Sequence, residues 1–364
     1  MLSATYVIPT LPPRPDLETV AVLRGAAKAH RHLAELKGRA RSIPNQAILI
    51  NALVLQEAKA SSEVENIVTT QDELFRASLF WEEADSPAAK EVANYGDALK
   101  RGFDRLQAGQ GLLTNNILIE MFQVLKRSQE RFRSTPGTAL KNQATGAVVY
   151  VPPQSEAEIV RHMKDLEVFI NDDAASDLDP LVKMALIHHQ FESIHPFSDG
   201  NGRIGRILNV LYLTRAGLLD IPVLYLSRYV TANKGEYYRL LQDVRDNGRW
   251  EPWLLYMLSA VSETARQTLH LIDGMSALMA DYKARLRAHE TIRYSQDLLN
   301  NLFRHPYTRI EFLQNDLEVT RQTAAKYLDQ LAAAGFVEKH QSGRNNYYVN
   351  TPLIALLMKV SDEG

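Results

Sequence analysis

Apolar residues recur at helical spacing along most of the chain. Ile204, Ile207, Leu208 and Leu211, for example, stand at i, i+3, i+4 and i+7, which places them on one face of a helix. The same kind of spacing, with Pro and small polar residues as start and stop signals, predicts further helices. These cover residues 17–36, 45–60, 90–106, 113–128, 156–170, 180–195, 234–246, 250–286 and 296–304. Strands do not alternate with helices and no internal repeat is visible, so we expect a mainly α protein.

Valine and tyrosine cluster at two places where β-strands are expected. Residues 148–151 follow a glycine turn and precede two prolines, which predicts a β-hairpin on an exposed edge. Near the end of the chain, a helix–turn–helix pattern stops at Gly335, and strands over 336–340 and 346–350 follow. This order looks like a winged helix-turn-helix over most of residues 293–350.

At 364 residues the chain is long for a single compact core, so several domains are expected. A polar stretch precedes the helix near residue 90, and the last 70 or so residues change from long helices to the strand-containing pattern. We therefore expect an N-terminal helical region over 1–90, a helical core with the β-hairpin over 91–290, and a winged helix-turn-helix over 291–364.

Composition and charge narrow the function classes. Hydrophobic residues make up 45% and charged residues 23%, which is ordinary for a folded globular protein. A formal net charge of -2 gives no general attraction to nucleic acid or membrane, and the absence of cysteine excludes disulfides and thiolate nucleophiles. The longest mostly apolar run, residues 47–56, is far shorter than the roughly 20 residues that span a bilayer. The start lacks the pattern of a signal peptide, so we expect a cytoplasmic protein without a membrane partner.

The segment HPFSDGNGRIGR, residues 195–206, carries the candidate chemistry. Its GNGRIG part matches the Gly-x-Gly-x-x-Gly pattern of dinucleotide-binding turns, but such a turn needs a preceding strand within a βαβ unit. Here the preceding element is a predicted helix, so a nicotinamide or flavin site is not expected. The overlapping HHQFESIH lacks the spacing of zinc hydrolase motifs. His188 and His189 are therefore interpreted as structural histidines.

Elementary chemistry makes the start of the following helix an anion site. Gly200 and Gly202 let backbone N–H groups approach a ligand at a helix N-terminus, where the helix dipole favours negative charge. Arg203 and Arg206 are three residues apart, so they project on one side and can grip successive phosphates. Asn201 can donate a further hydrogen bond to the same anion.

Two more side chains of this segment suit a reaction on a phosphate. Asp199 would repel a bare phosphate, but it fits a Mg²⁺ ion that also binds phosphate oxygens. His195 has an ordinary pKa of about 6.5 and can act as a general base near neutral pH. Together with the anion site, these residues predict phosphoryl or nucleotidyl transfer to a hydroxyl.

The whole segment resembles the signature of the Fic (filamentation-induced) family, H-P-F-x-[D/E]-G-N-G-R-x-x-R, at every specified position. The resemblance implies a protein adenylyltransferase, in which the histidine deprotonates a Ser, Thr or Tyr hydroxyl of a protein and that hydroxyl attacks the α-phosphate of ATP. It makes His195 the base and Asp199 the Mg²⁺ ligand. The implied nucleotide-binding residues begin the helix: Gly200, Asn201, Gly202, Arg203, Ile204, Gly205 and Arg206.

The resemblance extends along nearly the whole chain. GAVVYVPP resembles the family's flap, a strand (here from Val148 to Val151) along which a target protein can add by main-chain hydrogen bonds. KGEYYRLLQDVR resembles the stretch that borders the adenine, with Tyr238 as the first candidate and Tyr237 and Arg245 as weaker ones. The implied architecture is a Fic-associated N-terminal region, a Fic catalytic core and the terminal winged helix.

SSEVEN, residues 61–66, resembles the inhibitory motif [S/T]-x-x-x-E-[G/N] of the same family. The resemblance implies that Glu65 reaches Arg206 and displaces the γ-phosphate of ATP from its productive position, so the chain would be autoinhibited. The same residues also fit a capping box, with Ser62 capping a helix and Glu65 at its third position. The two interpretations are compatible, because a capped helix is a rigid mount for a reaching carboxylate.

The C-terminal region and the overall function leave alternatives. A winged helix usually binds DNA, with Arg321, Gln322 and Lys326 on the candidate recognition helix. Residues 295–350, however, contain six basic and six acidic side chains, so the basic footprint that DNA binding needs is missing and protein interaction or domain packing is favoured. Helical faces that could pair leave a homodimer open. Alternative functions are a transcriptional regulator whose Fic-like domain senses nucleotide, and a Fic enzyme that uses another nucleotide donor or removes AMP.

Overall fold

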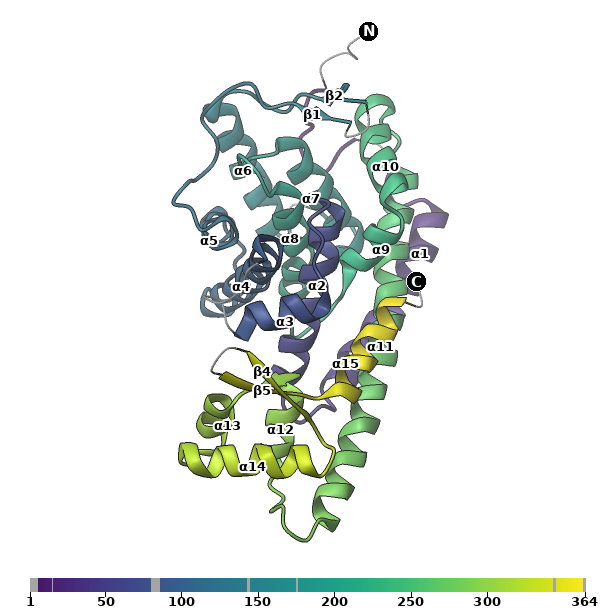
Figure 1. Ribbon diagram of the computed structural model, residues 1–364. Helices are drawn as coiled ribbons and strands as arrows, with labels where there is room; N and C mark the ends of the chain where they lie inside the picture. Colours follow the sequence, from purple (N-terminus) through teal and green to yellow (C-terminus); the bar gives the residue numbers. More distant parts are fainter. Residues whose placement is uncertain are drawn as a thin grey trace.

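A computed structural model describes residues 6–14, 16–79, 86–142, 145–174, 176–342 and 345–362 (Figure 1). Helices dominate, and two small antiparallel sheets complete the fold. The mainly α fold class predicted from the apolar spacing is thus confirmed. Within these residues, none of the helices combines the length and the apolar character needed to cross a membrane.

The N-terminal helices are α1 (Val20–Ala40), α2 (Gln46–Val64), α3 (Gln71–Leu79) and α4 (Pro87–Ala108). Helix α1 lies along the long helix α11 (Trp250–Ala288), and α2 packs against both α4 and α9 (Leu226–Ala232). Helix α2 has buried residues on every side, since apolar and small residues surround its whole circumference. The expected boundary between residues 90 and 91 falls inside α4, so a division there would cut a helix. The division into three regions stays a prediction.

The remaining helices of the core are α5 (Asn115–Lys126), α6 (Glu156–Asn171), α7 (Pro180–Ile194), α8 (Asn201–Arg215) and α10 (Lys234–Asn247). Helices α7 and α8 pack against each other at the centre, and nearly all of their residues are buried. Helix α7 starts sharply because Pro180 occupies its first turn and the Asp179 side chain accepts a hydrogen bond from the Leu181 N–H at 2.8 Å.

The predicted β-hairpin consists of β1 (Leu140–Lys141) and β2 (Val148–Tyr150), which pair antiparallel. Tyr150 is buried, whereas Val148, Val149 and Val151 beside it are exposed. The Tyr150 hydroxyl donates a hydrogen bond of 2.8 Å to the Ser193 carbonyl near the end of α7. The hairpin is therefore tied to the centre of the molecule beside the motif.

The C-terminal unit comprises α12 (Gln296–Arg304), β3 (Tyr307–Thr308), α13 (Ile310–Leu317), α14 (Arg321–Ala333), β4 (Glu338–Ser342), β5 (Asn345–Val349) and α15 (Thr351–Asp362). Its three strands form an antiparallel sheet in the order β3-β5-β4. Helix α15 then returns along α11, where Leu356 packs against the backbone of Gly274. Our interpretation of this unit as a winged helix-turn-helix stays a prediction.

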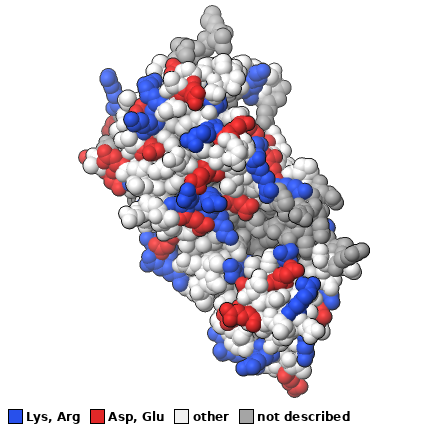
Figure 2. Space-filling model, turned by 90° about the vertical axis from the view of Figure 1, so that its left-hand side faces the viewer, with Lys and Arg blue, Asp and Glu red and all other residues white. Residues whose placement is uncertain are grey.

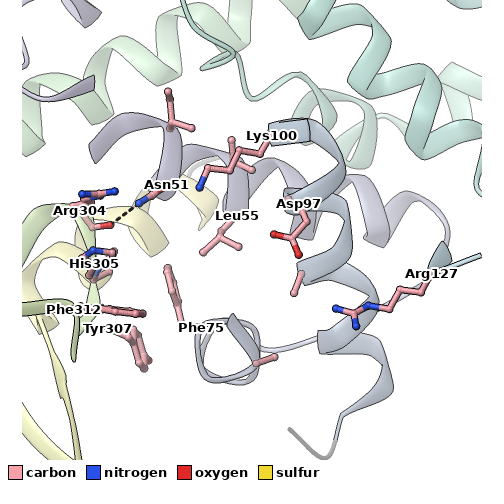
Figure 3. Close-up of a pocket in the computed structure, with 16 residues that line it drawn as sticks. Asn51, Leu55, Phe75, Asp97, Lys100, Arg127, Arg304, His305, Tyr307 and Phe312 are labelled. Carbon is pink, nitrogen blue, oxygen red and sulfur yellow. Dashed lines mark hydrogen bonds between the residues drawn. The ribbon is translucent and has the colours of Figure 1, made fainter. Parts of the chain in front are cut away.

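The C-terminal unit meets the N-terminal helices at a cavity of about 360 Å³ (Figure 3). Residues of α2, α3 and α4 form one wall, and residues 304–312 contribute to the other. The seam is held by Phe75, which stacks on Tyr307 with ring centroids 4.9 Å apart, and by the Tyr307 hydroxyl, which donates to Asp72 at 2.9 Å. These contacts couple α3, the helix that follows the SSEVEN segment in the sequence, to the C-terminal unit.

Candidate active site

A short loop joins α7 to α8 and holds the first half of the motif. Helix α7 ends at Ile194, and its C-cap His195 has a left-handed backbone (φ 51°). Helix α8 begins after Gly200, which is also left-handed (φ 71°). The Asn201 side chain closes this loop on itself: it accepts from the Phe197 N–H at 2.8 Å and donates to the Phe197 carbonyl at 2.9 Å. The Asn201 side chain thus shapes the loop, and its further donation to an anion stays a prediction.

The first turn of α8 is where a bound anion would be held. Its N–H groups have no partner within the helix, and the missing side chain of Gly202 leaves the backbone open. A Cβ atom on Gly202 would collide with the Glu65 carboxylate and would lie 3.0 Å from Arg206 Nη1. Ile204 is fully buried, so its side chain packs in the core rather than on the ligand side.

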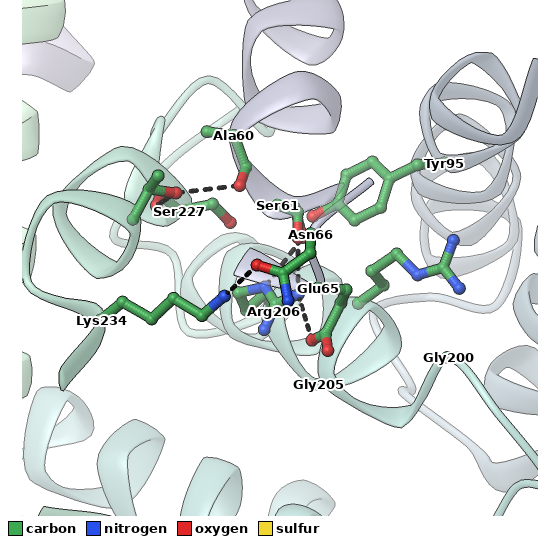
Figure 4. A network of polar contacts seen from close by, with 12 residues as sticks. Ala60, Ser61, Glu65, Asn66, Tyr95, Gly200, Gly205, Arg206, Ser227 and Lys234 are labelled. Atoms are coloured by element: carbon green, nitrogen blue, oxygen red, sulfur yellow. Dashed lines mark hydrogen bonds and ion pairs between the residues drawn. The ribbon is translucent and has the colours of Figure 1, made fainter. Parts of the chain in front are cut away.

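Arg206 is a buried guanidinium held by the end of α2 (Figure 4). Its Nε donates to the Ser61 hydroxyl at 2.8 Å, and its Nη2 donates to the Ser61 carbonyl at 2.8 Å and to Glu65 Oε1 at 2.9 Å. The structure thus brings together two residues that lie 141 positions apart in the sequence. Glu65 lies over the first turn of α8, with its carboxylate on Gly202.

The SSEVEN segment ends a helix and does not begin one. Helix α2 continues through both serines to Val64, and Glu65 is its C-cap, followed by Asn66 in the left-handed region (φ 61°). The Ser62 carbonyl accepts from the Glu65 N–H at 3.0 Å, as expected at a helix end. The capping box is therefore wrong, because the helix-forming residues before the serines extend the helix instead of stopping it.

Further contacts fix the end of α2 against α9 and α10. The Glu57 carboxylate is fully buried and accepts hydrogen bonds from the Ser227 N–H at 2.9 Å, from the Ser227 hydroxyl, and from the Tyr95 hydroxyl at 3.0 Å. Lys234 Nζ donates to the Asn66 side chain at 2.7 Å (Figure 4). No local pattern marks Glu57, because its partners come from distant parts of the sequence.

Asp199 and Arg203 belong to a cluster of four charged side chains. Asp199 Oδ2 lies 2.7 Å from Lys126 Nζ, and Arg203 Nη1 lies 2.7 Å from Glu91 Oε1. Burial alone would raise the pKa of Asp199, but the hydrogen bond and the charge of Lys126 hold this pKa below its ordinary value. Among the described residues, no group of three or more His, Cys, Asp or Glu side chains could hold a metal ion by itself.

His195 carries a neutral imidazole. Burial lowers the pKa of His195 to about 3, and the charges of Arg245 and Arg133 act in the same direction. Its buried Nδ1 has no hydrogen-bond partner among the described residues. The Arg133 Nε donates to the His195 carbonyl at 2.8 Å and its Nη2 donates to the Pro153 carbonyl, which links the loop to the hairpin. A neutral imidazole is the form that can accept a proton.

The histidines and tyrosines near the motif differ in their exposure to solvent. His188 Nε2 lies 2.7 Å from the Tyr237 hydroxyl, and His189 Nε2 lies 3.2 Å from the Leu241 carbonyl. Both histidines and Tyr237 are buried, whereas 43% of Tyr238 is exposed. Tyr238 is therefore the tyrosine of this pair that a ligand can reach, and the two histidines are packed in the core.

Comparisons with known proteins agree with this arrangement. Residues 23–104 match the Fic/DOC family N-terminal model, residues 113–213 the Fic/DOC family model, and residues 278–353 the model for the C-terminal domain of SoFic-like protein adenylyltransferases. The chain belongs to the Fic/DOC family.

Individual relatives match more weakly. "Protein adenylyltransferase fic-1" of Caenorhabditis elegans is 31% identical over 107 residues, which cover 29% of this chain and 19% of that protein. A probable protein adenylyltransferase of Aquifex aeolicus is 24% identical over 190 residues, which cover 50% of this chain and 55% of that protein. The matched region thus spans only part of these relatives.

Solved structures share the fold. A Fic family protein from Desulfovibrio desulfuricans superposes with a TM-score of 0.57 at 21% identity, covering 93% of this chain and 98% of that one. Fic-1 from C. elegans superposes with a TM-score of 0.53 at 20% identity, covering 69% and 73% of the two chains.

Proposed function

We propose that this chain is a protein adenylyltransferase that transfers AMP from ATP to a Ser, Thr or Tyr hydroxyl of a protein. The observation that carries this proposal is the connection between α7 and α8. There, the neutral imidazole of His195 lies on the same short loop as a helix N-terminus with two buried arginines. The Fic/DOC match over residues 113–213 and the names of the relatives support the same activity.

In the proposed step, His195 takes up the proton of the acceptor hydroxyl as the hydroxyl oxygen attacks the α-phosphorus. A bond forms between this oxygen and the α-phosphorus, and the bond to the oxygen that bridges to the β-phosphate breaks. Pyrophosphate leaves with the electron pair. The N–H groups at the start of α8, together with Arg203 and Arg206, stabilise the negative charge of the phosphates.

Asp199 fits the Mg²⁺ ion that the family resemblance implies. Its side chain is 65% exposed, it lies beside the first turn of α8, and it already attracts a cation, the ammonium of Lys126. Mg²⁺ usually binds through one or two carboxylates and completes its shell with phosphate oxygens and water, so one carboxylate is enough. When bound, the ion would neutralise charge on the phosphates of the leaving group.

Glu65 is proposed as a brake within the chain. The ion pair with Arg206 occupies the guanidinium that would otherwise bind the terminal phosphate, and the carboxylate lies on the open backbone of Gly202. Transfer then requires that the nucleotide displace Glu65.

The target protein would dock on the hairpin. Val149 and Val151 are exposed there. One edge of β2 pairs with β1, while the other edge carries no strand among the described residues.

Transfer from α-labelled ATP tests both the base and the brake. Glu65→Gly should raise labelling of the chain or of a lysate protein about tenfold or more. A charged hydrogen bond contributes about 1.5–3 kcal/mol, and 1.4 kcal/mol is about tenfold. Adding His195→Ala to Glu65→Gly should abolish labelling and leave binding of an ATP analogue intact.

Glu63→Gly is the matched control, because Glu63 lies in the same helix and pairs with Lys59 instead of Arg206. Equal activation by Glu63→Gly would show that loosening the helix matters and the Glu65 carboxylate does not. Labelling that survives His195→Ala would overturn the assignment of His195 as the general base. Mass spectrometry of the adduct identifies the transferred nucleotide, and an adduct other than AMP would overturn the proposed donor.

A further inference from the structure

Four charged side chains, three from helices and one from the loop before α8, form one chain of contacts beside the start of α8. Lys126, the last residue of α5, places its Nζ 2.7 Å from Asp199 Oδ2 and 3.1 Å from Glu91 Oε1 of α4. The same Glu91 oxygen lies 2.7 Å from Arg203 Nη1. Arg203 is only 2% exposed and reaches Asp199 only at 3.9 Å, so Glu91 is its near counter-charge.

Both oxygens of the Asp199 carboxylate are engaged in this arrangement. Oδ2 binds the Lys126 ammonium, and Oδ1 accepts the N–H of Gly200 at 2.6 Å. A divalent ion bound to Asp199 would be repelled by the Lys126 ammonium on the same carboxylate, which favours movement of the ammonium away from Asp199 when the ion binds. Glu91 offers the ammonium a second carboxylate that it already contacts.

The aliphatic part of the Lys126 side chain lies against the backbone of Gly200. Its Cδ is 3.7 Å from the position that a Cβ atom on Gly200 would take, and Leu125 Cδ2 is 3.1 Å from the same position. The end of α5 is therefore packed on the residue that starts α8. An isolated pair of surface charges contributes little to stability, but this pair joins a motif residue to a helix outside the motif.

We propose that Lys126 is the resident counter-ion of Asp199, that it is exchanged for the divalent ion when the nucleotide binds, and that Glu91 holds Lys126 and Arg203 through this exchange. Lys126 and Glu91 are thus positioning residues for the phosphate site. This inference rests on the proposed function, since it takes Asp199 as the metal ligand.

Calorimetric titration with an ATP analogue whose α- and β-phosphorus atoms are joined by a methylene group tests the exchange without turnover. The parent is Glu65→Gly, which removes the brake, and titrations run in EDTA and at rising Mg²⁺ concentrations. Lys126→Met should weaken binding in EDTA about fivefold to tenfold, because the uncompensated Asp199 charge repels the phosphates. The Mg²⁺ concentration at which half of the increase in affinity for the analogue is reached should fall by about threefold to tenfold.

Several variants sharpen the result. Lys126→Gln, a second neutral variant, should behave like Lys126→Met, and Lys126→Arg should retain the parent behaviour. Lys164→Met is the matched control on an exposed position of α6. In an Asp199→Asn background, Lys126→Met should cause no further change in Mg²⁺ dependence, because the two residues act as one unit.

The outcomes separate the inference from the proposed function. An unchanged Mg²⁺ dependence in the neutral Lys126 variants overturns the exchange and leaves the adenylyltransferase proposal standing. The exchange is also overturned if Lys126→Met changes the Mg²⁺ dependence as much in the Asp199→Asn background as in the parent. A parent that fails to bind the analogue at any Mg²⁺ concentration overturns the proposed function and the inference with it.

Discussion

Glu192 is a carboxyl group buried between α7 and α8, three residues before His195. Its Oε1 has no hydrogen-bond partner among the described residues and lies against the backbone of Gly205. Burial raises the pKa of Glu192 to about 7, the charge of Arg206 opposes this shift, and the charge of Glu65 adds to it. At neutral pH this group therefore stands near the midpoint of its titration.

The raised pKa of Glu192 predicts a pH-dependent stability. The folded chain binds this proton up to about pH 7, whereas the unfolded chain releases it at about 4.5, so the contribution of Glu192 to stability falls as pH rises from 4.5 to 7. The shift corresponds to about 3 kcal/mol at most. Glu192→Gln should therefore raise the melting temperature at pH 8 and leave it nearly unchanged at pH 5.

Glu251→Gln serves as the comparison, because Glu251 is exposed at the start of α11. A melting-temperature difference for Glu192→Gln that is the same at both pH values would show that the buried carboxyl keeps an ordinary pKa.

Single residues of the site were predictable where the motif itself supplies them. His195, Asp199 and the start of α8 follow one another in sequence, so their grouping on one loop needs no knowledge of the rest of the fold. Glu91 and Lys126 were not predictable, because each is an ordinary charged residue on a helix surface until α4 and α5 pack beside α8. The loop-closing role of the Asn201 side chain was not predictable either, because its partner, Phe197, becomes available only when the loop closes.

Helix α2 is the element on which the proposed brake depends. It brings Glu65 to Arg206. Its preceding turns are held by the buried carboxylate of Glu57, which accepts hydrogen bonds from Ser227 of α9 and Tyr95 of α4. A displaced α2 would move the Glu65 carboxylate away from the first turn of α8. The proposed brake is therefore a property of the whole helix as well as of its C-cap residue, Glu65.

Glu57→Gln tests this dependence. The glutamine would replace one accepting oxygen by an NH2 group, which would face the hydrogen-bond donors of Ser227 or Tyr95. The free energy of unfolding should therefore fall by about 1–3 kcal/mol. Transfer of labelled AMP should rise above the wild-type rate, because α2 is held less firmly. In the Glu65→Gly background, the same change should give no further rise.

Glu63→Gln, at a half-buried position of the same helix that pairs with Lys59, should lower stability less than Glu57→Gln does and leave transfer unchanged. A double variant that is more active than Glu65→Gly alone would show that Glu57 acts on the site by another route than the brake.

Elements with strong end signals were predicted closely, and elements without them were missed. Helix α12 has the predicted bounds, since Ser295 caps it and its apolar residues lie on one face. The short helices α3 and α9 were missed because too few turns exist to show a period. The end of α2 was placed four residues early, because Ser61 and Ser62 look like a stop although both are buried in the packed helix.

The charges of the whole molecule bear on its partners. The face shown in Figure 2 carries Lys and Arg interspersed with Asp and Glu, without a continuous basic surface. In the C-terminal unit several basic side chains are paired with acidic ones: Lys339 with Asp329 at 2.8 Å, Arg304 with Asp316 at 3.3 Å and Arg321 with Glu311 at 3.4 Å. Paired cations attract phosphates less than free ones.

Fluorescence anisotropy with a labelled DNA duplex is therefore expected to show no saturable binding tighter than about 1 µM at physiological salt, the range of non-specific contacts. A histone or another basic DNA-binding protein provides the positive control. Nanomolar binding that weakens steeply with salt would contradict the expectation and favour a transcriptional regulator.

Helix α11 joins the two ends of the molecule in one piece. At its start, Trp253 donates to the Ala185 carbonyl of α7 at 3.0 Å, and near its end the Tyr282 hydroxyl donates to the Phe336 carbonyl of the C-terminal unit at 2.8 Å. Its 39 residues correspond to about 58 Å of continuous helix. In Figure 1 the hairpin lies at one end of the molecule and the C-terminal unit at the other.

If the target of the proposed transfer is also held by the C-terminal unit, the length of α11 fixes the distance between that point of attachment and the segment of the target that meets the hairpin. Under the proposed function, the length of α11 would then help to select the modified hydroxyl. Lengthening α11 by whole turns would move the selected hydroxyl along the surface of the target.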